Sequence, residues 1–207
     1  MPYCDTIKPD KGIEIVIWQL TEDLPTLLQL WGNRPLPGYY ETATVDKRRR
    51  EILATALSLR QYYGHDIELH HAPNGAPFID QGHISISHTH TYIAIALHTT
   101  CKVGVDIETI GSRAPRVAPR FLSADELAAI PTDDTSARST AIHLAWSIKE
   151  AVFKVFPSAV EFRKDIILTP FSTLPQGSTT AHLTATGTNI EAHYTIYNGC
   201  SLAWVVE

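Results

Sequence analysis

The order of helical and strand-like patterns constrains the fold of this chain more than any other feature of its sequence. A strand, helices and a group of strands are followed by further helices and a second group of strands. The apolar spacing predicts these elements, in chain order, at 13–18, 24–31, 45–63, 67–71, 84–88, 92–97, 103–108, 116–122, 124–130, 137–156 and, as three or four strands, 166–206. Because this succession occurs twice, we expect an α+β fold with two lobes, residues 1–105 and 106–207, that together form one compact unit.

Three local signals set the expected ends of the helices. Thr21 is a competent N-cap for the first helix, and Gly64 is expected to end the second. Ser123 followed by Glu126 has the spacing of a capping box and predicts the start of a third helix.

Composition and charge exclude several classes of protein. The 207 residues are 44% apolar and 19% charged, which suits a folded domain with a sizeable core rather than a disordered chain. No apolar run approaches the roughly 20 residues that cross a bilayer, and the N-terminal residues lack a secretion signal. The net charge of −5 disfavours nucleic acid and anionic membranes as partners. We therefore expect a cytoplasmic protein with no nucleic-acid or membrane partner.

The strongest chemical signal is the pentapeptide Gly104–Glu108. In a strand, alternate side chains share a face, so Asp106 and Glu108 point the same way while Val105 and Ile107 point the other way. Two carboxylates on one face repel each other unless a cation lies between them, and oxygen ligands of this kind suit Mg²⁺. The alternative is a solvent-exposed strand end with two ordinary acids.

A second cluster lies in the helix expected at 137–156. Trp146, Glu150 and Lys154 follow one another at intervals of four residues, away from the apolar stripe of that helix. This spacing offers a third carboxylate for a metal ion and a cation for a phosphate. A Glu–Lys pair on an exposed helix explains it equally well.

Two further segments carry groups that can bind phosphate. The strand at 84–88 places Ser85 and Ser87 on one face and ends in His88, which can donate to a phosphate oxygen or serve as a hydrogen-bonded core histidine. The four cations at 47–50 begin a helix, where they oppose the macrodipole. A bound anion would relieve that repulsion, and a solvated basic turn is the alternative. Neither a glycine-rich phosphate loop nor a G-x-S-x-G elbow occurs.

Together these segments resemble the 4′-phosphopantetheinyl transferases, specifically the larger single-chain Sfp type. Three family blocks occur in the family's order: G-x-P then S-x-S-H (74–77 and 85–88), G-[IV]-D-[IV]-E (104–108) and W-[SA]-x-K-E-[AS]-x-x-K (146–154). Residues 120–126 are similar to the family's R-F-[FL]-S-x-x-E. The matches lie between residues 47 and 154, and the two acidic blocks are specific when taken together.

The resemblance implies the 4′-phosphopantetheinyl transferase fold, with two similar α/β lobes in a pseudo-twofold arrangement and coenzyme A between them. It also implies the reaction. A serine hydroxyl of an apo acyl or peptidyl carrier protein attacks the β-phosphate of coenzyme A, the phosphopantetheine arm is transferred, and adenosine 3′,5′-bisphosphate leaves. Two lobes in one chain make a monomer sufficient.

The resemblance also assigns roles by motif position. Asp106, Glu108 and Glu150 would hold Mg²⁺ on the pyrophosphate. Glu150 is also the candidate general base, acting directly or through a metal-bound water, Lys154 would neutralise phosphate charge, and Asp106 is counted with them among the catalytic residues. The residues that the resemblance assigns to coenzyme A are Arg48, Gly75, Pro77, Ser87, His88 and Lys154, with His88 near the 3′-phosphate.

Two positions depart from the family's pattern. Ala76 stands where members usually carry the Lys or Arg of G-[KR]-P, and Ala56 stands where the helix often carries a further arginine. We expect weaker coenzyme A binding or a shifted pose. Arg48 is the expected remaining helix arginine, and Lys47 and Arg49 are the alternatives.

Two other functions stay open at this stage. The same three carboxylates would serve a Mg²⁺-dependent phosphohydrolase that acts on a nucleotide and ignores carrier proteins. A non-catalytic binder of coenzyme A or of a carrier protein would keep the pocket without the chemistry. Ala76 favours this alternative, and the intact Asp106, Glu108, Glu150 and Lys154 argue against it. Arg113, Arg116 and Arg120 recur near one helical face, where they would form a basic surface for an acidic carrier protein or be merely solvated.

Overall fold

The computed structural model describes residues 4–9, 11–111, 114–159 and 161–207. The chain divides into two compact units, residues 1–100 (unit 1) and 101–207 (unit 2). The expected boundary at 105/106 falls inside strand β7 (Val103–Thr109), which belongs wholly to unit 2 because β11 (Cys200–Val206) pairs with it along its length. That the two units form one compact body in a pseudo-twofold arrangement stays an expectation.

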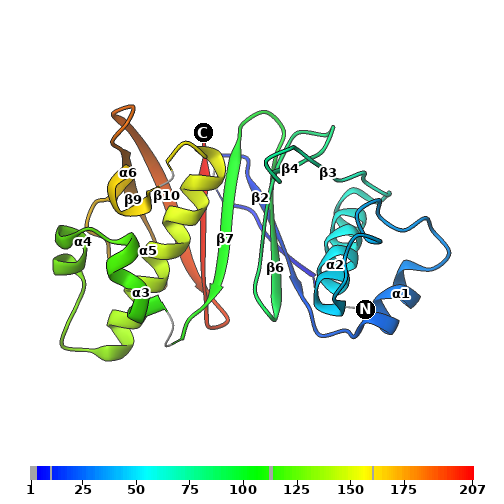
Figure 1. The fold of residues 1–207 in the computed structure, drawn as a ribbon, viewed down its shortest axis with the longest axis horizontal. Coiled ribbons are helices and arrows are strands. Elements are labelled where there is room, and N and C mark those ends of the chain that lie inside the picture. The colour runs from blue at the N-terminus through cyan, green and yellow to red at the C-terminus, as the bar shows by residue number, and fades with distance from the viewer. Residues whose placement is uncertain (1–3, 10, 112–113, 160) are drawn as a thin grey trace. The chain divides into compact units, whose positions relative to one another are not determined.

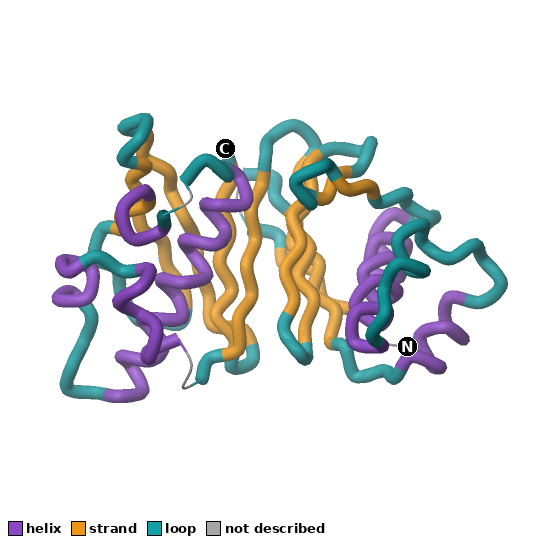
Figure 2. Tube along the Cα trace, in the orientation of Figure 1, coloured by secondary structure: helices purple, strands orange, loops and turns teal. Residues whose placement is uncertain are grey.

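In its described residues, unit 1 holds a four-stranded antiparallel sheet in the order β1-β2-β6-β5 and a separate short ladder of β3 with β4. Helix α2 packs on β2 and β6 (Figure 1), and a long loop joins α1 to α2 (Figure 2). The elements are β1 (Cys4–Ile7), β2 (Glu14–Gln19), α1 (Leu24–Trp31), α2 (Asp46–Tyr63), β3 (His70–His71), β4 (Pro77–Phe78), β5 (His83–His88) and β6 (Tyr92–His98).

The ends of the helices in unit 1 test the expected boundaries. Gly64 ends α2 in a left-handed conformation with φ 78°, as expected. The expected N-cap Thr21 is wrong, because α1 begins at Leu24 and the capping side chain belongs to Asp23. The Thr26 backbone N–H donates to Asp23 Oδ1 at 2.9 Å. The strand expected at 67–71 is reduced to its last two residues.

In its described residues, unit 2 holds a five-stranded antiparallel sheet in the order β7-β11-β10-β9-β8. The long helix α5 crosses one face of this sheet and contacts β7, β11 and β10 (Figure 1). Besides β7 and β11, the elements are α3 (Ala114–Phe121), α4 (Ala124–Ala129), α5 (Thr135–Val155), α6 (Phe162–Asp165), β8 (Ile166–Leu168), β9 (Gln176–Leu183) and β10 (Thr188–Tyr197).

The expected elements of unit 2 are largely confirmed. The capping box of Ser123 and Glu126 begins α4, and the C-terminal tail forms four strands. The mixture of helices and sheets in both units confirms the α+β class. Among the described residues, no helix is both long enough and apolar enough to span a membrane.

Gly104 sets how closely α5 approaches β7. A Cβ atom at this position would collide with the carbonyl oxygen of Ala151 and crowd Val155. A glycine is therefore required for packing at the point where the helix crosses the strand. The close approach places the residues that follow Gly104 on β7 against the last turns of α5.

Candidate functional site

An acidic cluster, Asp106, Glu108 and Glu150, is built on β7 and α5. Asp106 is 6% exposed, and its Oδ1 accepts a hydrogen bond from Lys154 Nζ at 3.1 Å. The same amine donates to the carbonyl oxygen of Val105 at 2.7 Å. Lys154 therefore ties α5 to β7, both through the strand backbone and through the first carboxylate of the acidic motif.

The charges of the acidic cluster act on one another. Burial raises the pKa of the Glu150 carboxyl to about 7, with further repulsion from Asp106 and Glu108 and a partial offset by Lys154. Without a bound metal ion, Glu150 therefore keeps its proton to a higher pH than an ordinary glutamate does. The repulsion means that the carboxylates of β7 and the carboxylate of α5 lie close together. A single site for both acidic motifs requires this proximity.

The donor set of this cluster suits a hard cation such as Mg²⁺, because Mg²⁺ prefers carboxylate oxygens as ligands. The described residues contain no group of three or more His, Cys, Asp or Glu side chains already arranged to hold a metal ion. Asp106 is engaged with Lys154 instead. The chemistry of the ligands fits Mg²⁺, and binding would require the three carboxylates to converge.

A large pocket of about 1360 Å³ in unit 2 opens beside the acidic cluster, and we call it the Trp146 pocket. Its wall contains an aromatic group, in which the Trp146 ring lies 4.9 Å from the Phe121 ring and 5.7 Å from the Phe162 ring, centre to centre. Its other lining residues include two acids of the cluster and several cations, namely Glu108, Glu150, Arg120, Arg163 and Lys164.

Some of the residues that line the Trp146 pocket could be predicted from the sequence, and others could not. Trp146 and Glu150 both line the pocket, as their spacing predicted, whereas Lys154, the third residue of that spacing, does not line it and bonds to β7. Phe162, Arg163 and Lys164 were missed because α6 has only four residues, too few for a helical period to show. Arg120 lines the pocket, Arg116 is exposed, and Arg113 lies outside the described residues.

A second pocket, of about 150 Å³, lies in unit 1, and we call it the Arg48 pocket. It brings together four of the residues assigned by resemblance to coenzyme A: Arg48, Gly75, Pro77 and His88. Ser87 is not among its lining residues. Because side chains alternate along β5, Ser87 points to the opposite face from Ile86 and His88, which both line the pocket.

Glu51 is the charged residue among those lining this pocket that sequence reasoning missed. It is 4% exposed, its Oε2 accepts a hydrogen bond from Arg48 Nη1 at 3.2 Å, and the same oxygen lies 3.4 Å from His88 Nε2. A buried carboxylate between two such groups holds both in place. Glu51 follows Arg48 by three residues on a predicted helix, and this spacing could have indicated that the two side chains pair.

The remaining cations at the start of α2 are also engaged, and Lys47 Nζ lies 3.7 Å from Glu51 Oε1. Arg49 Nε donates to the carbonyl oxygen of Ala43 at 3.0 Å, and Arg50 Nε donates to that of Glu22 at 2.8 Å. Both arginines therefore fasten α2 to neighbouring loops. Arg48 is the arginine of this run that lines the pocket.

Comparison with known proteins bears on unit 2. No curated protein matches the chain. The sequence model of the 4′-phosphopantetheinyl transferase superfamily matches residues 102–205, just over half of the chain. The matched segment begins one residue before β7, ends one residue before the end of β11, and contains the whole acidic cluster and Lys154. The chain therefore belongs to the 4′-phosphopantetheinyl transferase superfamily.

Proposed function

We propose that this protein is an Sfp-type enzyme that transfers the 4′-phosphopantetheine arm of coenzyme A to a serine of an apo carrier protein, with Mg²⁺ as its cofactor. Membership of the superfamily suggests phosphopantetheinyl transfer. The observation that carries the proposal is the meeting of both acidic motifs on β7 and α5, where Asp106 bonds to Lys154 and the other two carboxylates share a pocket. We further propose that it acts as a monomer in the cytoplasm.

In this proposal Asp106, Glu108 and Glu150 hold Mg²⁺, which supplies positive charge to the pyrophosphate when bound. Glu150 accepts the proton of the carrier serine at a carboxylate oxygen. The serine oxygen forms a bond to the β-phosphorus of coenzyme A, and the bond from that phosphorus to the bridging oxygen breaks. The electron pair leaves with adenosine 3′,5′-bisphosphate, and Lys154 stabilises negative charge on the phosphates.

The Arg48 pocket is the proposed place for a phosphate group of coenzyme A. Arg48 and His88 both present nitrogen donors to it, and Gly75 and Pro77 form part of its wall. Glu51 keeps the two donors in position. Ser87 points away from this pocket, so a contact between Ser87 and coenzyme A would use the other face of β5.

The test is intact-mass spectrometry of an apo acyl carrier protein incubated with this protein, coenzyme A and Mg²⁺. We expect the carrier to gain one phosphopantetheine arm, and the gain to disappear with EDTA or with Glu150→Gln. The matched control is Glu161→Gln, which changes an exposed carboxylate of the same pocket.

Two results would contradict the proposal. Coenzyme A binding with no modification of several carrier proteins would indicate a non-catalytic binder. Release of phosphate from coenzyme A or from a nucleotide, without carrier modification, would indicate a phosphohydrolase.

A further inference from the structure

A buried lysine that the proposed reaction does not use lies next to Glu150 in α5. The side chain of Lys149 is 0% exposed. Its Nζ donates to the carbonyl oxygen of Phe121 at 2.9 Å, to that of Phe162 at 3.0 Å and to the Glu126 carboxylate, whose Oε1 lies at 2.7 Å and Oε2 at 3.0 Å. An ammonium group carries three protons, so its donor capacity is fully used.

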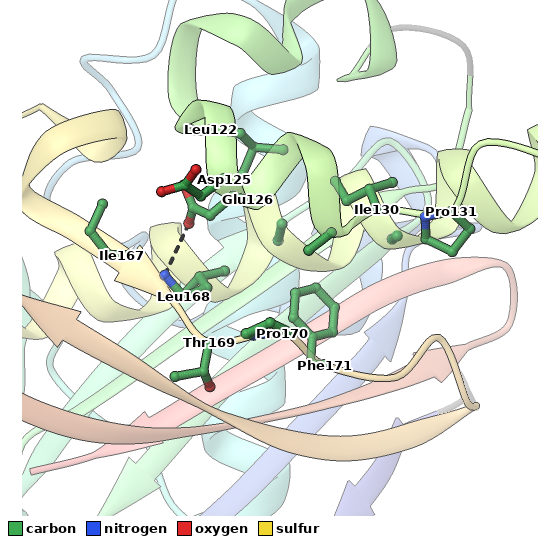
Figure 3. A pocket seen from close by; sticks show the side chains of 13 residues that line it. Leu122, Asp125, Glu126, Ile130, Pro131, Ile167, Leu168, Thr169, Pro170 and Phe171 are labelled. Atoms are coloured by element: carbon green, nitrogen blue, oxygen red, sulfur yellow. Dashed lines mark hydrogen bonds between the residues drawn. The ribbon is translucent and has the colours of Figure 1, made fainter.

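The carboxylate of Glu126 is equally engaged. Its Oε2 accepts from the Ser123 backbone N–H at 2.7 Å, and its Oε1 accepts from the Leu168 backbone N–H at 3.0 Å. Figure 3 shows the second of these bonds, with the Glu126 side chain reaching from α4 to the backbone of β8. The ion pair of Lys149 and Glu126 therefore joins α5 to the end of α3, the start of α4, the start of α6 and the end of β8.

Such a pair contributes more to geometry than to stability. Removing two charges from water costs free energy that an apolar pair of the same size would not cost. That cost is offset only where the polar groups are satisfied, as they are here. All of the bonds named above are directional, and two of them end on backbone carbonyls that no side-chain substitution at the acceptor can remove.

Those two carbonyls belong to Phe121 and Phe162, whose rings both contact the ring of Trp146. The Phe121 ring meets the Trp146 ring edge-on, and the Phe162 ring lies tilted against it. All three rings line the Trp146 pocket together with Glu150. Lys149 thus fixes the backbone from which both flanking rings project, one residue away from the proposed base.

We propose that Lys149 is a positioning residue, which holds Phe121 and Phe162 against Trp146 and so fixes the pocket wall beside Glu150. Lys149 acts through backbone carbonyls and makes no contact with substrate. The contacts described above support a role for Lys149 in positioning the pocket wall. An effect of that positioning on turnover rests on the proposed function.

The test uses the double variant Glu126→Gln/Lys149→Met, because removing Lys149 alone would leave a buried carboxylate without its partner. The matched control is Ile190→Ala, which weakens the same hydrophobic core from β10 without touching the ion pair. The probe is ¹⁹F NMR of protein labelled with 5-fluorotryptophan, and Trp146→Phe assigns the Trp146 resonance among the four tryptophans.

We expect the Trp146 resonance to shift or broaden in the double variant, while the other three resonances keep their positions. In Ile190→Ala the Trp146 resonance should stay in place. If the double variant does not fold, Lys149→Arg gives the second test. A planar guanidinium cannot direct three bonds as the ammonium does, so the Trp146 resonance should move there too. A resonance that stays in place in the folded variant would overturn the inference.

Transfer kinetics give an independent readout. We expect kcat of the double variant to fall about tenfold or more relative to Ile190→Ala, since small displacements near reacting groups are costly. A kcat within twofold of that control would also overturn the inference. If the unaltered protein transfers nothing, the proposed function fails, and the Trp146 resonance still decides whether Lys149 positions the pocket wall.

Discussion

Glu150→Gln should change how the free energy of unfolding depends on pH in the metal-free protein. The Glu150 carboxyl has a pKa of about 7 in the folded chain against an ordinary value of 4.5, a difference worth about 3 kcal/mol when each tenfold change in proton affinity counts as about 1.4 kcal/mol. Below pH 4.5 the carboxyl is protonated in both the folded and the unfolded state. Between pH 4.5 and 7 the folded state keeps its proton while the unfolded state loses it, so stability falls as pH rises.

Glutamine at this position does not titrate, so the variant should lack this loss. Denaturant unfolding of both proteins in EDTA, at pH values from 4.5 to 8, measures the difference directly. We expect the variant to gain up to about 3 kcal/mol on the unaltered protein across this range. Glu161→Gln, which replaces an exposed carboxylate of the same pocket, is the matched control. Parallel profiles for Glu150→Gln and the unaltered protein would refute the reasoning.

Three further predictions concern packing, capping and ligand binding. Gly104→Ala should prevent unit 2 from reaching its native packing, which loss of a cooperative unfolding transition would show and a native-like melting temperature would contradict. Asp23→Ala should lower the free energy of unfolding by about 1 kcal/mol, whereas Thr21→Ala should change it little, and equal effects in denaturant titration would argue against the assigned cap. Arg48→Gln should weaken coenzyme A binding by about tenfold or more in calorimetry, from the loss of a charge-assisted hydrogen bond, and Arg49→Gln is its matched control. Equal affinities for these last two variants would remove Arg48 from the site.

Patterns that repeat over short distances predicted much of the fold. The alternation around Asp106 gave β7, the four-residue spacing of Trp146 and Glu150 gave one side of α5, and Ser123 with Glu126 gave the start of α4. Each of these patterns lies within a single element. Within one element, the residues that become buried are the same ones whose apolar spacing is visible in the sequence.

Features that depend on partners distant in the sequence could not be predicted. Glu126 was recognised only as part of a capping box, yet its carboxylate also meets Lys149 and Leu168, 23 and 42 residues away. Ser87 is a different case, because its motif grouped it with His88 although the alternation of side chains along a strand, which the sequence itself shows, puts the two on opposite faces. Helix α6 was not predicted, because four residues are too few to show a helical period in the sequence.

The glycine of the acidic motif also has a consequence for the pairing of β7. If β7 slipped by one residue relative to its neighbours, Val103 or Val105 would replace Gly104 at the crossing with α5. Neither side chain could be accommodated beside the carbonyl oxygen of Ala151, since even a methyl group collides there. A slipped strand would also turn Asp106 to the opposite face of the sheet. The crossing thus admits a single alignment of β7, the one in which the carboxylate meets Lys154.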